Sequence, residues 1–188
     1  MKNQLLHTPE GVRDIYNEEC EKKLELQDRL HKALKRHGYH SIQTPTFEFF
    51  DIFGKEVGTI PSNELYKFFD REGNTLVLRP DITPSIARSA AKYFMDEDMP
   101  IRLSYMGNTF INNHSYQGRL KESTQLGAEL IGDDTVDGDA EMIAMAIDAL
   151  KSSGLKNFQI SVGHVEFFRG LMEAAGLSEE QEEVIREL

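Results

Sequence analysis

A long hairpin with a polar tip is the feature that most limits how this chain can fold. The stretch Met106–Gly132, MGNTFINNHSYQGRLKESTQLGAELIG, consists of an apolar strand, a polar loop containing a glycine, and a second apolar strand. We expect the first strand to cover Ile101–Asn112. Because side chains alternate along a strand, Gln125 and Glu129 share one face of the sheet. The stretch therefore predicts an antiparallel hairpin that carries polar groups on one side.

The remaining elements are predicted from periodicity, glycine and proline. We expect helices at Asn17–His37, Thr83–Phe94, Gly138–Ser152 and Glu166–Ala175, and strands at Tyr39–Thr44, Tyr66–Asp70, Thr75–Arg79 and Phe158–Val162. Thr83 is expected as the N-cap of its helix, with Pro84 at the first helical position. Hairpins, rather than helical crossovers, join most of the strands. This favours an α+β fold, an antiparallel sheet flanked by helices, over a doubly wound parallel sheet.

Size and composition indicate one globular domain. The chain has 188 residues, of which 39% are hydrophobic, so we expect a single core over residues 1–188. A helical pattern, opened by a Ser178–Gln181 capping box, still runs at Leu188, which predicts a chain truncated at its C-terminus. No apolar run approaches the roughly 20 residues that a bilayer requires. With no signal-peptide core and one cysteine, Cys20, the sequence predicts a cytoplasmic protein.

The acidic net charge argues against a nucleic-acid partner. The net charge is −11, and the only locally basic segments are Lys32–His37 and Arg119–Lys121. Nucleic-acid binders usually present a basic patch, because phosphates contribute most of the affinity. Neither segment is a convincing footprint for tRNA.

Four polar residues are candidates for a binding pocket. Asp81 and Thr83 lie at a corner between a strand and a helix N-terminus, where they could hold an ammonium group or a small polar ligand. The alternative is that Thr83 only caps the helix and Arg79 only pairs with Asp81. Glu129 is costly to desolvate on a central strand, so with Gln125 it indicates a polar pocket floored by the sheet. The alternative is a structural ion pair between Glu129 and an arginine, Arg79 or Arg102.

Other chemistry is sparse. The sequence has no His/Cys set at metal-ligand spacing, no HExxH, no phosphate-binding loop and no dinucleotide fingerprint, so we predict no metal site and no cofactor. Of six scattered histidines, His164 is the one for which a site role deserves a test. Closely spaced aromatic residues follow Pro45, and they are interpreted as core beneath a loop or as a partner surface: Phe47, Phe49, Phe50 and Phe53.

Several of these segments together resemble the catalytic domain of class II aminoacyl-tRNA synthetases, and within that class histidyl-tRNA synthetase. The resemblance rests on TPEGVRD, on GYHSIQTPTFE (motif 1, the dimer element), on LVLRPDIT and on the motif 2 hairpin ending in TQLGAELIG. It covers nearly the whole chain and corresponds to the N-terminal part of that fold. It implies that Asp81, Thr83, Gln125 and Glu129 stand at the histidine-binding positions. It also implies that Arg119 matches an arginine that contacts ATP phosphates in the synthetase.

One departure from the synthetase pattern points to a paralogous family. Motif 2 of the synthetase carries Phe-Arg-x-Glu, whereas this chain has Phe110 followed by Ile111, Asn112 and Asn113. Losing the arginine removes a cation that grips the α-phosphate and the carboxylate. The segments TPEGVRDIYNEE, FEFFDIF and NTFINNHSYQG resemble the regulatory subunits of ATP phosphoribosyltransferase, which do not charge tRNA.

This second resemblance implies a non-catalytic role in the first step of histidine biosynthesis. The implied partners are the short-form catalytic subunit, a second copy bound through motif 1, and histidine as feedback ligand; no tRNA and no membrane is implied. Arg119 would then be a residual phosphate contact or would face the partner. Two alternatives stay open, a histidyl-tRNA synthetase with a divergent motif 2 and a stand-alone histidine-binding sensor.

Overall fold

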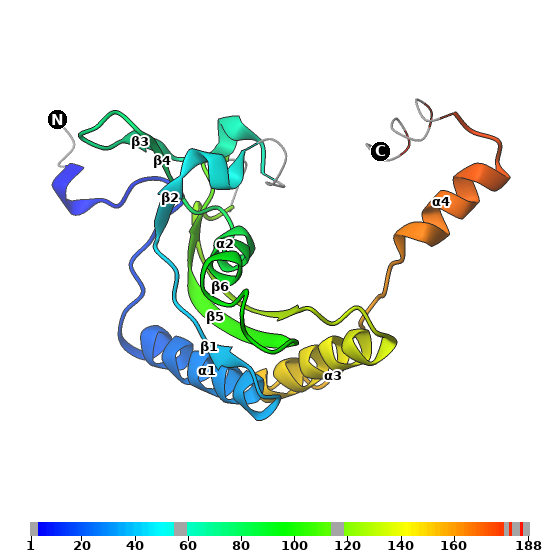
Figure 1. The fold of residues 1–188 in the computed structure, drawn as a ribbon. Coiled ribbons are helices and arrows are strands. Elements are labelled where there is room, and N and C mark those ends of the chain that lie inside the picture. Colours follow the sequence, from blue (N-terminus) through cyan, green and yellow to red (C-terminus); the bar gives the residue numbers. More distant parts are fainter. Residues whose placement is uncertain (1–3, 55–59, 114–118, 179–180, 182–184, 186–188) are drawn as a thin grey trace. The chain divides into compact units, whose positions relative to one another are not determined.

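The computed structural model describes residues 4–54, 60–113, 119–178, 181 and 185, which fall into two compact units, Met1–Gly154 and Leu155–Leu188 (Figure 1). The first unit contains η1 (Gln4–Leu6), α1 (Asn17–Arg36), β1 (His40–Ser41), β2 (Phe47–Phe49), η2 (Phe50–Phe53), η3 (Ser62–Glu64), β3 (Lys67–Phe69), β4 (Thr75–Leu78), α2 (Thr83–Tyr93), β5 (Ile101–Phe110), β6 (Glu122–Ile131) and α3 (Val136–Ser153). The second unit contains α4 (Val165–Ala174). Within the described ranges, no helix has both the length and the apolar character needed to cross a bilayer.

The predicted hairpin forms the main sheet, in the order β1-β5-β6. Strands β5 and β6 pair antiparallel over their full length, from Ile101 opposite Ile131 to Phe110 opposite Glu122. β1 runs parallel to β5, with His40 opposite Leu103. The sheet is therefore mixed at one edge, and its centre is the hairpin that the sequence predicts.

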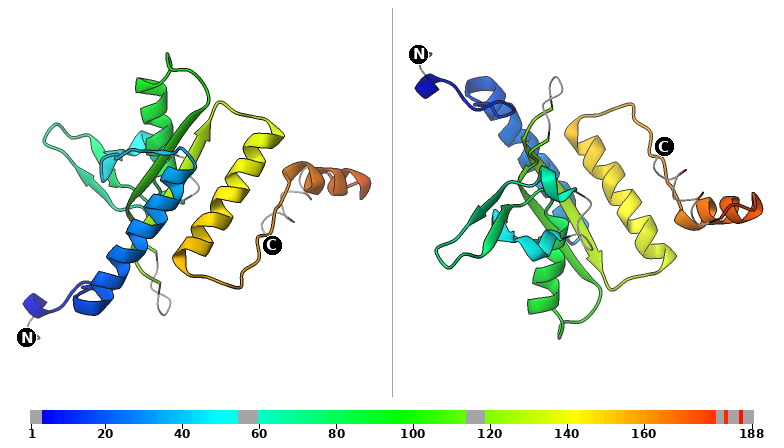
Figure 2. Two further views of the ribbon diagram at one scale, coloured as in Figure 1. Left: turned by 90° about the horizontal axis from the view of Figure 1, so that it is seen from below. Right: turned by 90° about the horizontal axis from the view of Figure 1, so that it is seen from above.

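Helices cover both faces of this sheet, because β5 and β6 carry apolar side chains on both faces. On one face, α2 packs Ile82 and Ile86 against Leu103 and Tyr105 of β5. On the other face, α1 and α3 lie side by side (Figure 2) and enclose a second cluster. That cluster contains Leu34, Tyr39, Met142, Met145, Leu126 and Ala128. The odd-numbered residues of β6 consequently face the α2 side.

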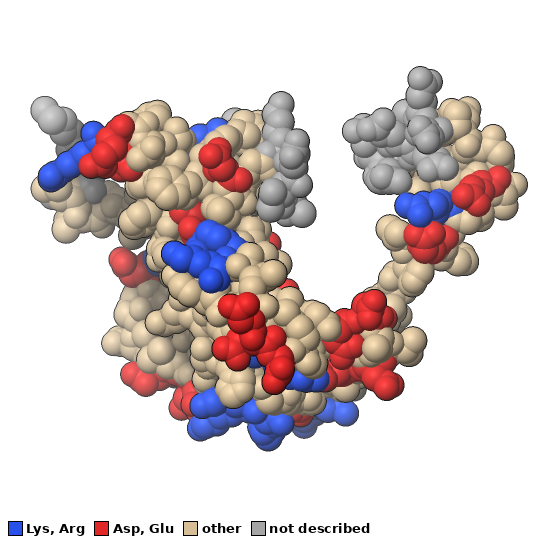
Figure 3. All heavy atoms as spheres, viewed as in Figure 1, with Lys and Arg blue, Asp and Glu red and all other residues tan. Residues whose placement is uncertain are grey.

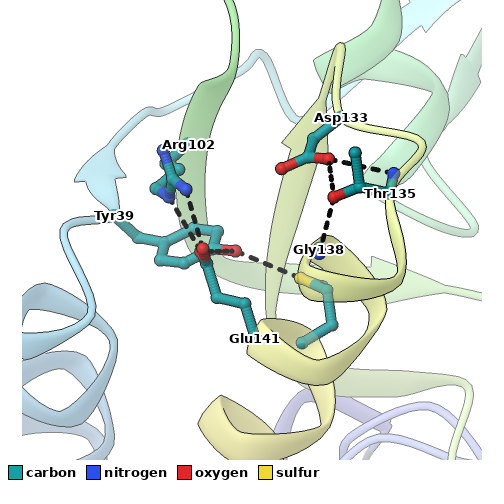
Figure 4. Close-up of polar contacts among 7 residues, drawn as sticks. Tyr39, Arg102, Asp133, Thr135, Gly138 and Glu141 are labelled. Carbon is teal, nitrogen blue, oxygen red and sulfur yellow. Dashed lines mark hydrogen bonds and ion pairs between the residues drawn. The ribbon is translucent and has the colours of Figure 1, made fainter.

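An ion pair and a helix cap fix the start of α3 (Figure 4). Glu141 accepts hydrogen bonds from Nε and Nη2 of Arg102, at 2.8 and 2.7 Å, and one from the Tyr39 hydroxyl at 3.0 Å. These bonds, the one with Arg102 foremost, lower the pKa of Glu141 to about 2. The Thr135 hydroxyl accepts from the backbone N–H of Gly138 at 3.2 Å, as N-caps do.

A second sheet, in the order β2-β4-β3, is antiparallel throughout. Its Val77 is fully buried with Phe53 and Leu65. The interpretation of the aromatic run as core therefore holds for Phe53 and for the partly buried Phe50 that packs against it, but not for Phe47 and Phe49, which are 50% and 56% exposed. The exposed rings lie on the outer face of the strand, because Glu48 between them turns inward to bond Arg88.

Two predicted strands are corrected by the structure. Over Tyr39–Thr44 only His40 and Ser41 belong to a strand, because the chain diverges from β5 on its way to Pro45, which cannot donate to a ladder. Residues 158–162 have no regular structure, since no described strand of their unit offers them a partner. Residues 55–59 lie outside the described residues, as do residues 114–118, which follow β5 and precede β6 in the sequence.

Candidate functional site

Asp81 sits at the corner between β4 and α2 and takes over the role of a helix cap. Its Oδ1 accepts hydrogen bonds from the backbone N–H groups of Ile82 at 2.6 Å and Thr83 at 3.3 Å. Thr83 is the first helical residue and Ile82 precedes it without a side-chain cap, so the predicted Thr83 N-cap was wrong. The carboxylate satisfies orphan donors at the positive end of the helix, which favours an anion there.

Gln125 of β6 locks this corner to the hairpin. Its Nε2 donates to Asp81 Oδ1 at 2.9 Å, and its Oε1 accepts from the Ile82 N–H at 3.3 Å. The amide is therefore oriented by two bonds, and one more N–H on Nε2 is left. Residues 44 positions apart in sequence meet here because α2 packs on the odd-numbered face of β6.

Tyr105 connects the other two predicted residues, and sequence reasoning missed it. Its hydroxyl donates to Glu129 Oε1 at 3.1 Å and lies 3.2 Å from the Thr83 hydroxyl. A phenol hydroxyl has a single proton, and Tyr105 donates it in the hydrogen bond to Glu129. In a hydrogen bond between the two hydroxyls, Thr83 is therefore the donor. Burial, before the charge of Glu129, raises the pKa of Tyr105 to about 12, so the phenol stays protonated at neutral pH.

A glycine opposite Tyr105 makes this arrangement possible. Gly127 pairs with Tyr105 across the hairpin, and a Cβ added to it would overlap the tyrosine ring. An aromatic residue facing a glycine on the neighbouring strand is a signal that could have been read from the sequence, given the register. All four predicted residues thus lie around Tyr105 and Asp81 in one polar network: Gln125 bonds Asp81, Tyr105 bonds Glu129, and the Thr83 hydroxyl, 3.2 Å from Tyr105 and 3.5 Å from Asp81, can donate its one proton to either of them.

The two arginines that might have neutralised this network are engaged elsewhere. Arg79, only 6% exposed, donates to the carbonyls of Thr44 at 2.9 Å, Pro45 at 3.1 Å and Asn108 at 2.9 Å. It thereby joins the segment after β1 to β5 where the two diverge, and burial lowers its pKa. Arg102 is bound by Glu141. The alternatives in which Arg79 pairs with Asp81, or either arginine with Glu129, are therefore not what the structure shows.

Ile111, Asn113 and Arg119, at the far end of the hairpin, have no hydrogen bond to the network among the described residues. Ile111 continues the ladder beyond β5, with its N–H donating to the Lys121 carbonyl at 2.9 Å. Asn113 Oδ1 is buried, and within the described part of the chain it has no hydrogen-bond partner. Arg119 is exposed beside the stretch that is left undescribed. Among the described residues, then, the site holds two carboxylates and no cation bonded to either.

His164, the histidine for which a site role was considered, has a structural role. His164 caps α4, since its Nδ1 accepts from the Glu166 N–H at 3.2 Å. In the described ranges no three His, Cys, Asp or Glu side chains gather as metal ligands would. A cavity of about 300 Å³ lies beside the network, lined by Tyr105, Ile82 and Arg79 among others.

Comparison with known proteins links the chain to two kinds of protein. A sequence profile of the family described as histidyl-tRNA synthetase matches residues 11–188. Two curated relatives, named ATP phosphoribosyltransferase regulatory subunit, come from Acetivibrio thermocellus and Ruminiclostridium cellulolyticum; they are 51% and 48% identical over 97% and 98% of this chain. The chain spans 44% of the length of each.

A solved structure agrees with both descriptions. It is a protein from Bacillus halodurans titled as an ATP phosphoribosyltransferase regulatory subunit/histidyl-tRNA synthetase. It superimposes with a TM-score of 0.87 at 38% identity, over 97% of this chain and 47% of that one.

Proposed function

The chain belongs to the histidyl-tRNA synthetase family, and from this premise we propose that it is part of a regulatory subunit of ATP phosphoribosyltransferase. The α+β fold of class II synthetase type that the sequence predicts is confirmed by the solved relatives. The proposed protein has no catalysis of its own. It activates the short-form catalytic subunit in the first step of histidine biosynthesis and makes that subunit sensitive to histidine.

One observation carries the proposal: the second strand of the hairpin has the polar residues of a ligand pocket, whereas the residue after the first strand is not the arginine that adenylate formation needs. On β6, Gln125 and Glu129 remain bonded to Asp81 and Tyr105, as a pocket for a small polar ligand requires. Beyond β5, Ile111 stands where the resemblance to motif 2 implies an arginine. An apolar side chain cannot stabilise the charge that builds up during adenylate formation, and losing such a clamp costs on the order of 3 kcal/mol of transition-state stabilisation.

In this proposal the pocket keeps a sensing role. Asp81, Thr83, Gln125 and Glu129 bind a histidine-like ligand, while Arg119 faces the partner or keeps a residual phosphate contact. Feedback then requires two states of the assembly that the ligand distinguishes. The names of the curated relatives support the partner, because a regulatory subunit implies a catalytic one.

The other proposed partner is a second copy of the chain, bound through α1 and the segment that follows it. Only Ala33 and Leu34 of α1 are buried, whereas its apolar Leu24 is 53% exposed. A tRNA partner is not proposed. On the face drawn in Figure 3, the basic side chains form small groups with acidic ones between them, and the net charge is −11.

The alternative is a histidyl-tRNA synthetase with a divergent motif 2, favoured by the family profile alone. Histidine-dependent exchange of pyrophosphate into ATP separates the two. We expect no exchange above background by the full-length protein, with an authentic histidyl-tRNA synthetase as the positive control. Robust exchange would contradict the regulatory function.

A further inference from the structure

We infer that the outer face of the second sheet, β2-β4-β3, is covered by the same face of a second copy of the chain. The inference rests on the proposed function, since it adds a defined surface to the pair of copies proposed there. It follows from the way apolar and charged side chains are divided between the two faces of that sheet.

The outer face of this sheet carries apolar residues from all three strands. Residues that pair directly across strands share a face, so the register places five side chains on this side: Phe47, Phe49, Phe68, Leu76 and Leu78. The rings of Phe47 and Phe68 meet edge to face, with their centroids 5.8 Å apart. These five residues are called the aromatic face, and none of them is charged.

The charged residues of the same strands point the other way. Glu48, between two exposed phenylalanines, is 8% exposed and accepts from Arg88 at 2.7 Å. Lys67 of β3 donates to Ser62 Oγ at 2.6 Å, and its Nζ lies 4.8 Å from the centroid of the Phe50 ring. An antiparallel sheet with one face in water usually turns its polar residues outward. This sheet does the reverse, so its outer face has the composition of a face that another surface covers.

A second copy of the chain suits this face better than a partner recognised by charge. Each copy has a net charge of −11, so two copies repel, and contact costs least where neither surface has a charged side chain. The aromatic face offers no ionic group to a phosphate or to a charged peptide. The edge strands β2 and β3 have three residues each, and edges this short disfavour the addition of a peptide strand.

The exposed area of the face agrees with the centre of a larger interface between two copies. Phe47, Phe49 and Phe68 are 50%, 56% and 37% exposed, which leaves about 290 Å² of aromatic surface in water if a whole side chain has about 200 Å². A stable interface buries about 800 Å² on each partner around an apolar centre. The remaining area would come from α1 and the segment after it, which passes through Pro45 directly into β2.

Tryptophan substitution tests the inference, because the chain has no tryptophan of its own. Phe49→Trp places a fluorescent reporter on the aromatic face. Phe69→Trp is the matched control, since Phe69 is 72% exposed but pairs with Thr75 on the opposite face. Emission of the full chain is recorded across the concentrations at which analytical ultracentrifugation shows it to dimerise, and unsubstituted protein serves as the blank. We expect the Phe49→Trp emission to shift to shorter wavelength as the dimer forms, and the Phe69→Trp emission to stay constant.

A charge on the aromatic face tests the same surface by affinity. Phe49→Glu places two like charges in the interface of the pair, so we expect dimerisation at least about tenfold weaker. Phe69→Glu should leave the dissociation constant within about twofold of the wild-type value. Circular dichroism shows whether each variant is folded, and if Phe49→Glu does not fold, the tryptophan reporter decides.

Four results would overturn the inference. The protein stays monomeric, or it dimerises while the Phe49→Trp emission does not change. The emission is already shifted at every concentration, which would mean that its own chain covers the face. The shift appears only when the catalytic subunit is added, which would assign the face to that partner. Activation of the catalytic subunit is measured separately by mixing the two proteins, so the inference and the proposed function can fail independently.

Discussion

Replacing Tyr105 with Phe removes one oxygen atom from the centre of the site and leaves the packing of the ring in place. The residue is 7% exposed, and its hydroxyl both donates to Glu129 and accepts from Thr83. A hydrogen bond to a charged group contributes about 1.5–3 kcal/mol and a neutral one about 0.5–1.5 kcal/mol. Thr83 can turn back to Asp81, 3.5 Å away, which recovers part of the second bond.

We therefore expect Tyr105→Phe to lower the free energy of unfolding by about 2 kcal/mol. In a chain of this size that corresponds to a fall in Tm of about 4–8 °C. Urea denaturation at pH 7, followed by circular dichroism, measures the first quantity, and a thermal scan measures the second.

The matched control is Tyr93→Phe. Tyr93 ends α2 and is 63% exposed, so losing its hydroxyl should change the free energy of unfolding by no more than about 0.5 kcal/mol. If the two variants were equally stable, the hydroxyl of Tyr105 would not hold the network together, and the reasoning about the site would be refuted.

Three further predictions concern groups that support the site. Glu141→Gln should lower the free energy of unfolding by about 1–2 kcal/mol at pH 7. Because the pKa of Glu141 is lowered to about 2 in the folded protein, its contribution to stability is complete above the ordinary value of 4.5 and should fade as the pH falls from there. Urea titrations of wild type and variant should therefore converge towards pH 2, and a difference that stays constant with pH would contradict this. Gly127→Ala should lower the free energy of unfolding by about 1–3 kcal/mol, because the added methyl group displaces the Tyr105 ring. In a Tyr105→Ala background the same substitution should lower it clearly less, which a double-mutant cycle by urea denaturation measures. Arg79→Met should lower the free energy of unfolding by about 3 kcal/mol or more, because three carbonyls lose a buried donor. Arg79→Lys should restore less than half of that loss. If the unfolding midpoint of Arg79→Met were close to that of the wild type, Arg79 would not hold these segments together.

Local patterns predict the elements of this fold well where the signal lies within one segment. The helix from Asn17, the hairpin strands and the helix ended by Gly154 agree with the structure to within two or three residues. The misplaced features depend on distant partners. Residues 158–162, predicted as a strand, pair with no described strand of their own unit, and β1 owes its two residues to a parallel pairing with β5 that no local pattern encodes.

The site shows the same division. Alternation alone puts Gln125 and Glu129 on one face, and the corner before α2 singles out Asp81. Tyr105 was not predicted as a site residue, because its role depends on the hairpin register, which places it opposite Gly127. The preference for Thr83 as a cap failed because the helix already begins at Thr83, where the Asp81 carboxylate accepts from the N–H groups of Ile82 and Thr83.

Reconstitution with the catalytic partner tests the central claim most directly. The full-length protein is mixed with a short-form ATP phosphoribosyltransferase, and phosphoribosyl transfer is followed with and without added histidine. We predict that activity appears on mixing and falls when histidine is added. Glu129→Gln should keep the activation and weaken the response to histidine, while Glu122→Gln should behave as wild type. Transfer at the same rate with and without this protein would contradict the account.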